Sequence, residues 1–191
     1  LKGAGDDVFF LGKQTTLTSA LIKDMSTGYM GTKYSAAYND LTGWNWETGA
    51  DVPLLRYADV LLIHAEAEIF LAGGGPNDRT KGVAAAAASF NEVRVRAFGG
   101  DNSKAISAPT FNDLVKERRC ELAYEDERHY DLVRWGLAKE VYAAATTASD
   151  PRGPRTFDPA KDAHFPIPQR EIENTDYLLV NNPNDGYSNF K

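Results

Sequence analysis

The sequence predicts a mainly α fold with long irregular loops. An apolar stripe at helical spacing extends from Leu54 to Ala72 and stops at Gly73-Gly74-Gly75-Pro76, a strong helix terminator. A second apolar side, with Val60, Ile63 and Leu71, indicates a helix wedged between neighbours. Prolines at 151, 154, 159, 166 and 168 forbid long helices toward the C-terminus.

The chain divides into three zones of different composition. Residues 1–53 are rich in Gly, Thr and Asn, which is typical of loops and short extended pieces, and residues 137–191 form an irregular, Pro-rich tail. Residues 54–136 form the predicted helical core. After its first helix, a second is expected at about 81–98, where the alanines at 84–88 offer a close-packing surface. A third begins at Thr110, which forms a capping box with Asp113.

Composition excludes several classes of partner and structure. With 191 residues, 42% hydrophobic and 25% charged, the chain is long enough for one ordinary domain. A net charge of −6 argues against a nucleic-acid partner, which needs a basic face. No apolar run reaches the roughly 20 residues of a membrane-spanning helix. Cys120 is the single cysteine, so an internal disulfide is impossible.

Charged residues at helical spacing predict a structural network. Arg56 with Asp59 and His64 with Glu68 lie on the first helix, and several more charges follow in the third and its continuation. The predicted network consists of Arg56, Asp59, Arg118, Glu121, Arg128, Asp131 and Arg134. A catalytic carboxylate pair is the alternative, since two carboxylates can hydrolyse glycosides. Cys120 with His129 as nucleophile and base is disfavoured, because no oxyanion donor is visible.

Aromatic residues before the first helix are the candidate binding site. Trp44 and Trp46 flank Asn45, so in an extended segment their rings point to the same side. Tyr34, Tyr38 and Asn39 lie nearby in sequence, and aromatic faces with amides suit a sugar ring and its hydroxyls. The alternative is that both tryptophans cap the helical core. The sequence predicts neither a cofactor nor a metal site, since His64, His129 and His164 are too scattered.

Five ordered segments resemble the SusD/RagB family, the nutrient-binding lipoproteins that work beside a TonB-dependent transporter in Bacteroidetes outer membranes. They are Thr27-Gly28-Tyr29 with Lys33-Tyr34, the helix from Arg56 to Ala67, Phe90 to Ala97, Glu117 to Glu125 with Arg128 to Gly136, and Phe165 to Pro168 with Glu171-Ile172 and Asn182-Pro183. Two departures are visible. Asp126-Glu127 stands where the family usually has Gly, which favours longer helices in place of a tight turn, and Asn184 and Asp185 separate Pro183 from Gly186.

The resemblance implies a tetratricopeptide-like helical array and a fragment lacking the family's N-terminal part. It further implies a surface glycan-binding lipoprotein, not an enzyme, that delivers oligosaccharides to a SusC-like TonB-dependent transporter. Membrane attachment would come only through an N-terminal lipid anchor absent from these residues, which places the full-length protein at the cell surface of the outer membrane. Two alternatives stay open: a RagB-like peptide-binding lipoprotein, and an intracellular helical-repeat scaffold that binds a protein.

Overall fold

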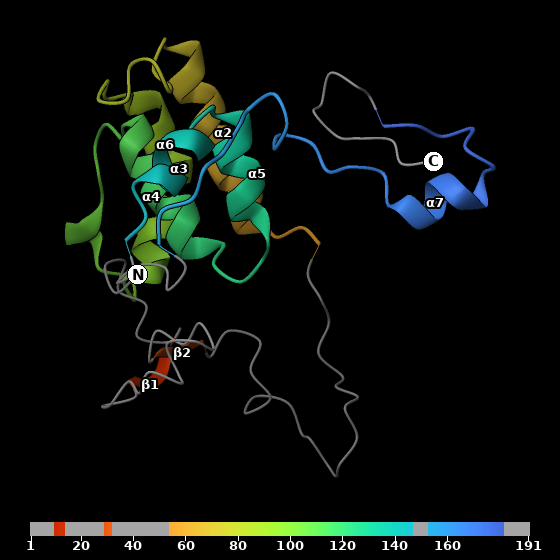
Figure 1. Ribbon diagram of the computed structural model, residues 1–191. Helices are drawn as coiled ribbons and strands as arrows, with labels where there is room; N and C mark the ends of the chain where they lie inside the picture. Colours follow the sequence, from red (N-terminus) through yellow and green to blue (C-terminus); the bar gives the residue numbers. More distant parts are fainter. Residues whose placement is uncertain (1–9, 14–28, 32–53, 147–152, 182–191) are drawn as a thin grey trace. The chain divides into compact units, whose positions relative to one another are not determined.

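The computed structural model describes residues 10–13, 29–31, 54–146 and 153–181 of the chain (Figure 1). The elements in order are β1 (Phe10–Lys13), β2 (Tyr29–Gly31), α2 (Tyr57–Leu71), the 3₁₀ turn η3 (Ala84–Ala86), α3 (Ala87–Ala97), the 3₁₀ turn η4 (Asn102–Lys104), α4 (Phe111–Glu121), α5 (Glu127–Arg134), α6 (Ala138–Ala143) and α7 (Gln169–Asn174). The predicted mainly α class is confirmed. The chain divides into two compact units, residues 1–130 and 131–191.

Strands β1 and β2 form a two-stranded antiparallel sheet. Phe10 lies opposite Gly31 and Lys13 opposite Tyr29, with an irregularity of register between these pairs. Short extended pieces are what the composition of residues 1–53 predicts.

Helix α2 is the centre of the first unit and packs against both α3 and α4. Its buried side carries Ala58, Leu62, Ala65 and Ile69. The helix ends at Leu71, and Gly73 continues the chain with a φ of +80°, a conformation that glycine adopts without strain. The predicted stop at the glycine run is therefore correct.

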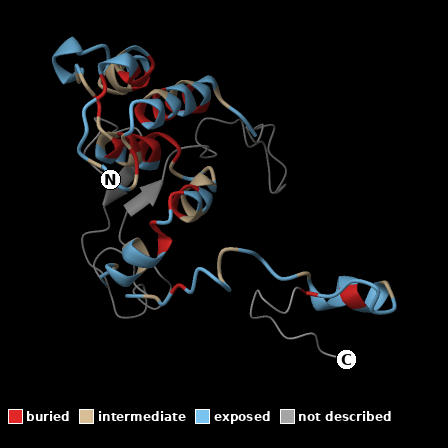
Figure 2. Ribbon diagram, turned by 90° about the horizontal axis from the view of Figure 1, so that it is seen from above, coloured by how far each residue is buried: buried red, intermediate tan, exposed pale blue. Residues whose placement is uncertain are grey.

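The second predicted helix is shorter than expected. The chain first makes the 3₁₀ turn η3, and only Ala86 of the five alanines is buried, while Ala84, Ala85 and Ala88 are exposed. The alanine run is thus mainly solvent-facing, and the expected close-packing surface is wrong for most of it. The side chains that α3 buries are instead Ser89, Phe90 and Val93. Figure 2 shows that the helices carry both buried and exposed parts.

A loop between α3 and α4 is held by side chains of α3. Asn91 accepts a hydrogen bond from the backbone N–H of Ile106 at 2.8 Å and donates one to its carbonyl at 2.9 Å. The loop leads into the capping box predicted at Thr110: its hydroxyl accepts from the Asp113 N–H, and the Asp113 carboxylate accepts from the Thr110 N–H. The start of α4 is therefore predicted correctly.

The connection between α4 and α5 corrects the sequence prediction. Without the family's glycine, the two helices were expected to continue further, yet α4 ends at Glu121 and α5 begins at Glu127. Tyr124 and Asp126 adopt positive φ values of 68° and 61° and so make the tight turn themselves. Such conformations cost about 1–2 kcal/mol per non-glycine residue, so the surrounding packing must offset that cost.

The second unit, residues 131–191, contains the end of α5 and the short helices α6 and α7. Its buried side chains are Leu132, Trp135, Leu137, Phe157 and Ile172. The prolines limit its helices as predicted. Between Pro166 and Pro168, the Ile167 N–H donates to the Asn181 side chain at 2.7 Å. This hydrogen bond joins the two ends of the segment that contains α7. Among the described residues, none of the helices combines the length and apolarity that a membrane crossing requires.

Candidate functional site

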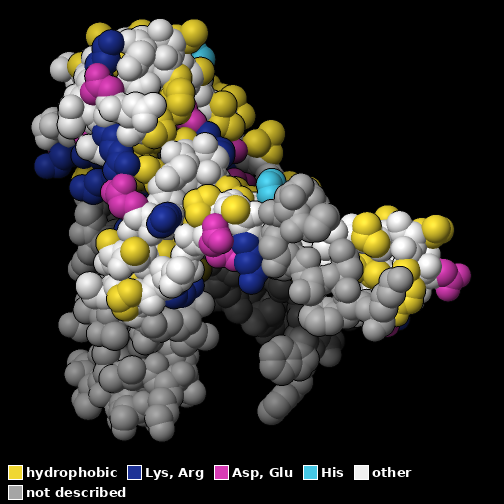
Figure 3. Space-filling model, turned by 45° about the horizontal axis from the view of Figure 1, so that its top comes forward, with side chains coloured by type: hydrophobic (Ala, Val, Ile, Leu, Met, Phe, Trp, Pro, Cys, Tyr) yellow, Lys and Arg dark blue, Asp and Glu magenta, His cyan; other side chains and the backbone are white. Residues whose placement is uncertain are grey.

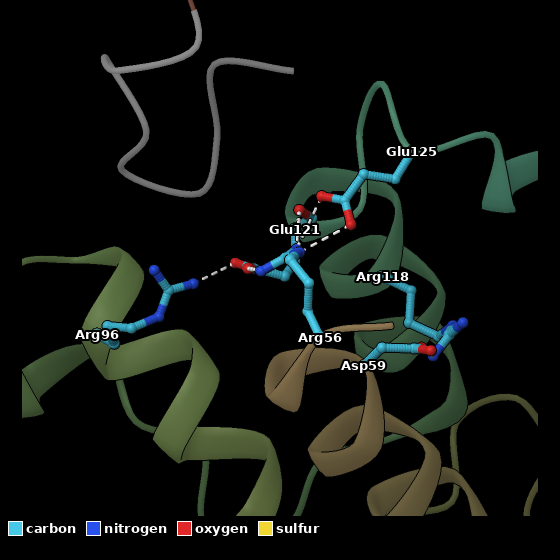
Figure 4. A network of polar contacts seen from close by, with 6 residues as sticks. All are labelled: Arg56, Asp59, Arg96, Arg118, Glu121 and Glu125. Atoms are coloured by element: carbon cyan, nitrogen blue, oxygen red, sulfur yellow. Dashed lines mark hydrogen bonds and ion pairs between the residues drawn. The ribbon is translucent and has the colours of Figure 1, made fainter. Parts of the chain in front are cut away.

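The aromatic residues proposed as a binding platform lie outside the described part of the chain. They are Trp44, Trp46, Tyr34, Tyr38 and Asn39, all within residues 32–53. Their role stays a prediction. The site that the structure does place is the charged network at one end of α2, α3 and α4 (Figure 4).

Arg56, at the beginning of α2, joins this helix to the end of α4. Its Nε and Nη2 donate to the two carboxylate oxygens of Glu125 at 2.8 and 2.9 Å, a bidentate arrangement. Its Nη1 donates to Glu121 Oε1 at 3.0 Å, and its Nη2 also reaches the Glu121 carbonyl at 3.1 Å. The Arg56 guanidinium therefore binds the carboxylates of Glu121 and Glu125 and the last backbone carbonyl of α4.

Glu121 connects all three helices. Its Oε1 accepts from Arg56 on one side, and its Oε2 accepts from Arg96 of α3 at 2.5 Å on the other. The Glu121 side chain is only 5% exposed, so its charge needs these partners. With Asp59 and Arg118, the drawn cluster contains three carboxylates and three guanidinium groups and is neutral overall.

Asp59 and Arg118 form the most buried pair of the cluster. Arg118 Nη1 donates to Asp59 Oδ1 at 2.7 Å, and the two side chains are 3% and 13% exposed. The sequence suggested that Arg56 and Asp59 pair with each other within α2, and this is wrong: both reach residues of α4 instead. The local contacts of His64 with Glu68, at 3.9 Å, and of Arg134 with Asp131, at 2.8 Å, occur as predicted.

Two arginines of α3 were missed by reasoning from the sequence. Arg94 donates to buried Glu117 at 2.7 Å and to the Lys104 carbonyl at 2.7 Å, while Arg96 contacts Glu121. The available signal was a pair of arginines in an otherwise apolar half of a helix. A guanidinium at such a position indicates a buried acid elsewhere in the fold.

Electrostatics favour a permanently charged Arg56. Burial lowers the pKa of Arg56, but its hydrogen bonds to Glu125 and Glu121 outweigh burial and raise that pKa above the ordinary arginine value. Arg56 is thus protonated at every physiological pH. A cation that never titrates is suited to holding helices together and unsuited to transferring protons.

The geometry argues against hydrolysis by these carboxylates. Both oxygens of Glu121 and both oxygens of Glu125 accept hydrogen bonds from arginine. A general acid or nucleophile in glycoside hydrolysis must present an oxygen to the substrate. The remaining predicted network residues lie on α5: Asp131 is buried and bonded by Arg134 at 2.8 Å, and Arg128 is partly buried.

Cys120 has the environment of an unreactive thiol. It is buried on α4, and burial followed by the nearby charge of Glu117 raises the pKa of the thiol above its usual value. The thiolate is the nucleophilic form, so these surroundings oppose reactivity. His129 makes an edge-on ring contact with Tyr130.

A serine, a histidine and a glutamate come together between α2 and α3, a grouping that the sequence did not suggest. His64 Nδ1 lies 3.1 Å from Ser89 Oγ, while its Nε2 is 3.9 Å from Glu68. The second distance is too long for a hydrogen bond. Ser89 is buried on α3, and its hydroxyl also donates to the Ala86 carbonyl at 3.4 Å. The contact therefore ties two helices together. Among the described residues, no group of three or more His, Cys, Asp or Glu could hold a metal ion.

Comparisons with known proteins agree with one another. The model of the SusD family matches residues 5–187. Two SusD-like proteins of Formosa agariphila are 33% and 29% identical over 155 and 154 residues, or 76% and 75% of this chain. A crystal structure of a SusD homolog from Bacteroides thetaiotaomicron superimposes with a TM-score of 0.60 at 27% identity, over 81% of this chain.

These relatives are much longer than residues 1–191. The chain spans 28% of the length of each Formosa protein and 31% of the Bacteroides chain. The family match nevertheless covers nearly all of the sequence, residues 5–187. The chain belongs to the SusD family.

Proposed function

We propose that this protein is a surface glycan-binding lipoprotein that captures oligosaccharides and passes them to a SusC-like TonB-dependent outer-membrane transporter. The observation that carries the proposal is membership of the SusD family over residues 5–187, a range that includes the aromatic segment. Anchoring at the outer-membrane surface, through a lipid outside these residues, is part of the same proposal. Family membership favours this function over an intracellular repeat scaffold.

The charged network supports binding without catalysis. The carboxylates that could have formed a hydrolytic pair are occupied by arginines, and the single thiol is buried. The helices would then form a rigid support, and ligand contacts would come from the loops they carry. We place the contacts at Trp44 and Trp46, with Tyr34, Tyr38 and Asn39 beside them, because stacked aromatic rings bind the C–H faces of sugars.

The test is calorimetric binding of the complete polypeptide to a panel of oligosaccharides and a panel of peptides. Trp44→Ala and Trp46→Ala should each weaken oligosaccharide binding by roughly 1–3 kcal/mol, the value of a large side chain buried by a ligand. The melting temperature should stay nearly unchanged. Tyr130→Ala is the matched control, because Tyr130 is a 58% exposed aromatic on α5 and should leave binding intact.

Three results would contradict the proposal. Binding to peptides alone would indicate a RagB-like peptide carrier. A drop in stability of about 3–5 kcal/mol, with normal binding per folded molecule, would make the tryptophans part of the core. Release of reducing sugar ends from any oligosaccharide of the panel, lost on mutation of Glu121, would make the protein an enzyme.

A further inference from the structure

Two residues of the turn between α4 and α5 adopt a backbone conformation that side chains disfavour. Tyr124 and Asp126 have φ values of 68° and 61°. A positive φ is an outlier for a bulky residue and is less unusual for Asp. The positive φ of Tyr177, 63°, has a local explanation, because its N–H donates to the Ile172 carbonyl at 3.0 Å and so closes the end of α7. At Tyr124 the chain has already left α4, which ends at Glu121.

The residue between the two strained positions holds the turn in place. The N–H of Glu125 donates to the Leu122 carbonyl at 3.2 Å. Its carboxylate accepts two hydrogen bonds from the Arg56 guanidinium, at 2.8 and 2.9 Å. Figure 4 shows the Glu125 side chain pointing toward Arg56. This bidentate ion pair connects the turn to the beginning of α2 and can offset the strain of its neighbours.

The side chains of the two strained residues are exposed. Tyr124 is 58% exposed, and Asp126 is exposed as well. Among the described residues, none forms a hydrogen bond, an ion pair or a ring contact with either side chain. Within this part of the molecule, the strain is therefore not offset by contacts of the strained side chains themselves. Backbone strain of this kind is concentrated at binding sites, where it holds side chains in position for a ligand.

We propose that Tyr124 and Asp126 form a contact site for a neutral sugar ring. The exposed phenol ring offers a flat apolar surface to the C–H face of a sugar, and the carboxylate accepts hydrogen bonds from its hydroxyls. The carboxylate favours uncharged sugars, because it repels a uronic acid or a sulfate group. Figure 3 shows hydrophobic side chains next to charged ones at the surface. This inference rests on the proposed function and adds contacts to those of the tryptophans.

Calorimetric binding of the complete polypeptide to neutral hexasaccharides of glucose, galactose, mannose and xylose tests the inference. Tyr124→Ala should weaken binding about tenfold, because the ring and the sugar face return to water. Asp126→Asn should weaken it about threefold, because an amide oxygen accepts weaker hydrogen bonds than a carboxylate. Tyr130→Ala is the matched control. Tyr130 is also 58% exposed but lies within α5, so its loss should change the affinity less than twofold.

Tyr124→Gly separates binding from folding. Glycine adopts a positive φ without strain, so this variant should melt at or above the temperature of Tyr124→Ala while binding equally weakly. Affinity within about twofold of the parent for Tyr124→Ala or Tyr124→Gly would overturn the inference. The proposed function would still stand if Trp44→Ala weakened binding. Tighter binding of a uronic-acid hexasaccharide than of any neutral one would also overturn the inference. Failure to bind every hexasaccharide would overturn both.

Discussion

Opposite charges are joined in two different ways in the two units of this chain. In residues 1–130 the arginines of the cluster meet carboxylates far along the chain: Arg118 and Asp59 are 59 residues apart, and Arg56 and Glu125 are 69 apart. In residues 131–191, Arg134 and Asp131 are three residues apart on one turn of α5. Pairs of the first kind fix how helices pack, while the second kind adds only to a helix that is already formed.

The two kinds of pair also differ in how deeply their side chains are buried. The side chains of Arg118 and Asp59 are 3% and 13% exposed, whereas that of Arg134 is 43% exposed. A buried charge that loses its partner cannot recover hydration, but an exposed one can. The comparison therefore predicts large effects of mutation between helices and small effects within α5.

The largest effect is expected for Arg118→Met. This change keeps most of the side-chain volume and leaves the Asp59 carboxylate buried without Arg118, which costs about 3–5 kcal/mol for pairs of this kind. Urea unfolding followed by circular dichroism should show that loss. Arg119→Met is the matched control on the exposed side of α4 and should stay within about 0.5 kcal/mol.

A second substitution, which removes the Asp59 charge left without Arg118, makes the same test more specific. Adding Asp59→Asn to Arg118→Met should recover part of the lost stability, because the neutral amide is far less costly to bury than a carboxylate. If Arg118→Met is as stable as the parent while the control behaves as expected, the pair contributes nothing to packing. The network would then need a role other than a structural one.

A smaller effect is expected for Glu121→Gln. The amide retains the shape of the side chain but replaces the charge that Arg56 and Arg96 share. Charged hydrogen bonds contribute about 1.5–3 kcal/mol, and the 61% exposure of Arg96 places the expected loss near 2 kcal/mol. Thermal unfolding monitored by circular dichroism measures it. Glu92→Gln on the exposed side of α3 should change little, and a comparable loss there would mean that net charge, not the bridge, matters.

Local signals predicted the fold well. The glycines after Ala72 and the capping box at Thr110 act within a few residues, so they fix the end of α2 and the start of α4. The prediction for the α4–α5 turn was wrong because it relied on local signals as well. No glycine marks it, and Tyr124 and Asp126 accept a positive φ that only their tertiary surroundings can stabilise.

Reasoning from the sequence named four of the six residues of the charged cluster, Arg56, Asp59, Arg118 and Glu121, but not how they pair. Spacing along one helix finds partners three or four residues apart, and it therefore paired Arg56 with Asp59. The actual partners of Arg56 are 65 and 69 residues away, at positions that depend on how α2 packs against α4. Arg94 and Arg96 were overlooked because each meets its acid 23 or 25 residues along the chain. Pairing of this kind follows from tertiary packing and leaves no periodic signal.

The smallest effect is expected for Arg134→Ala in α5. The guanidinium donates to Asp131 at 2.8 Å and lies over the Trp135 ring at 4.6 Å, but water can replace much of both contacts because the side chain is 43% exposed. We expect a loss of about 1 kcal/mol or less. A salt titration distinguishes the two kinds of pair. Raising sodium chloride from 0.05 to 1 M should reduce the stability loss caused by Arg134→Ala, because exposed charges are screened. The stability loss caused by Arg118→Met should stay almost unchanged. A large, salt-independent loss for Arg134→Ala would mean that a pair formed within one helical turn can stabilise the fold as strongly as a pair between helices, and the distinction between the two units would fail.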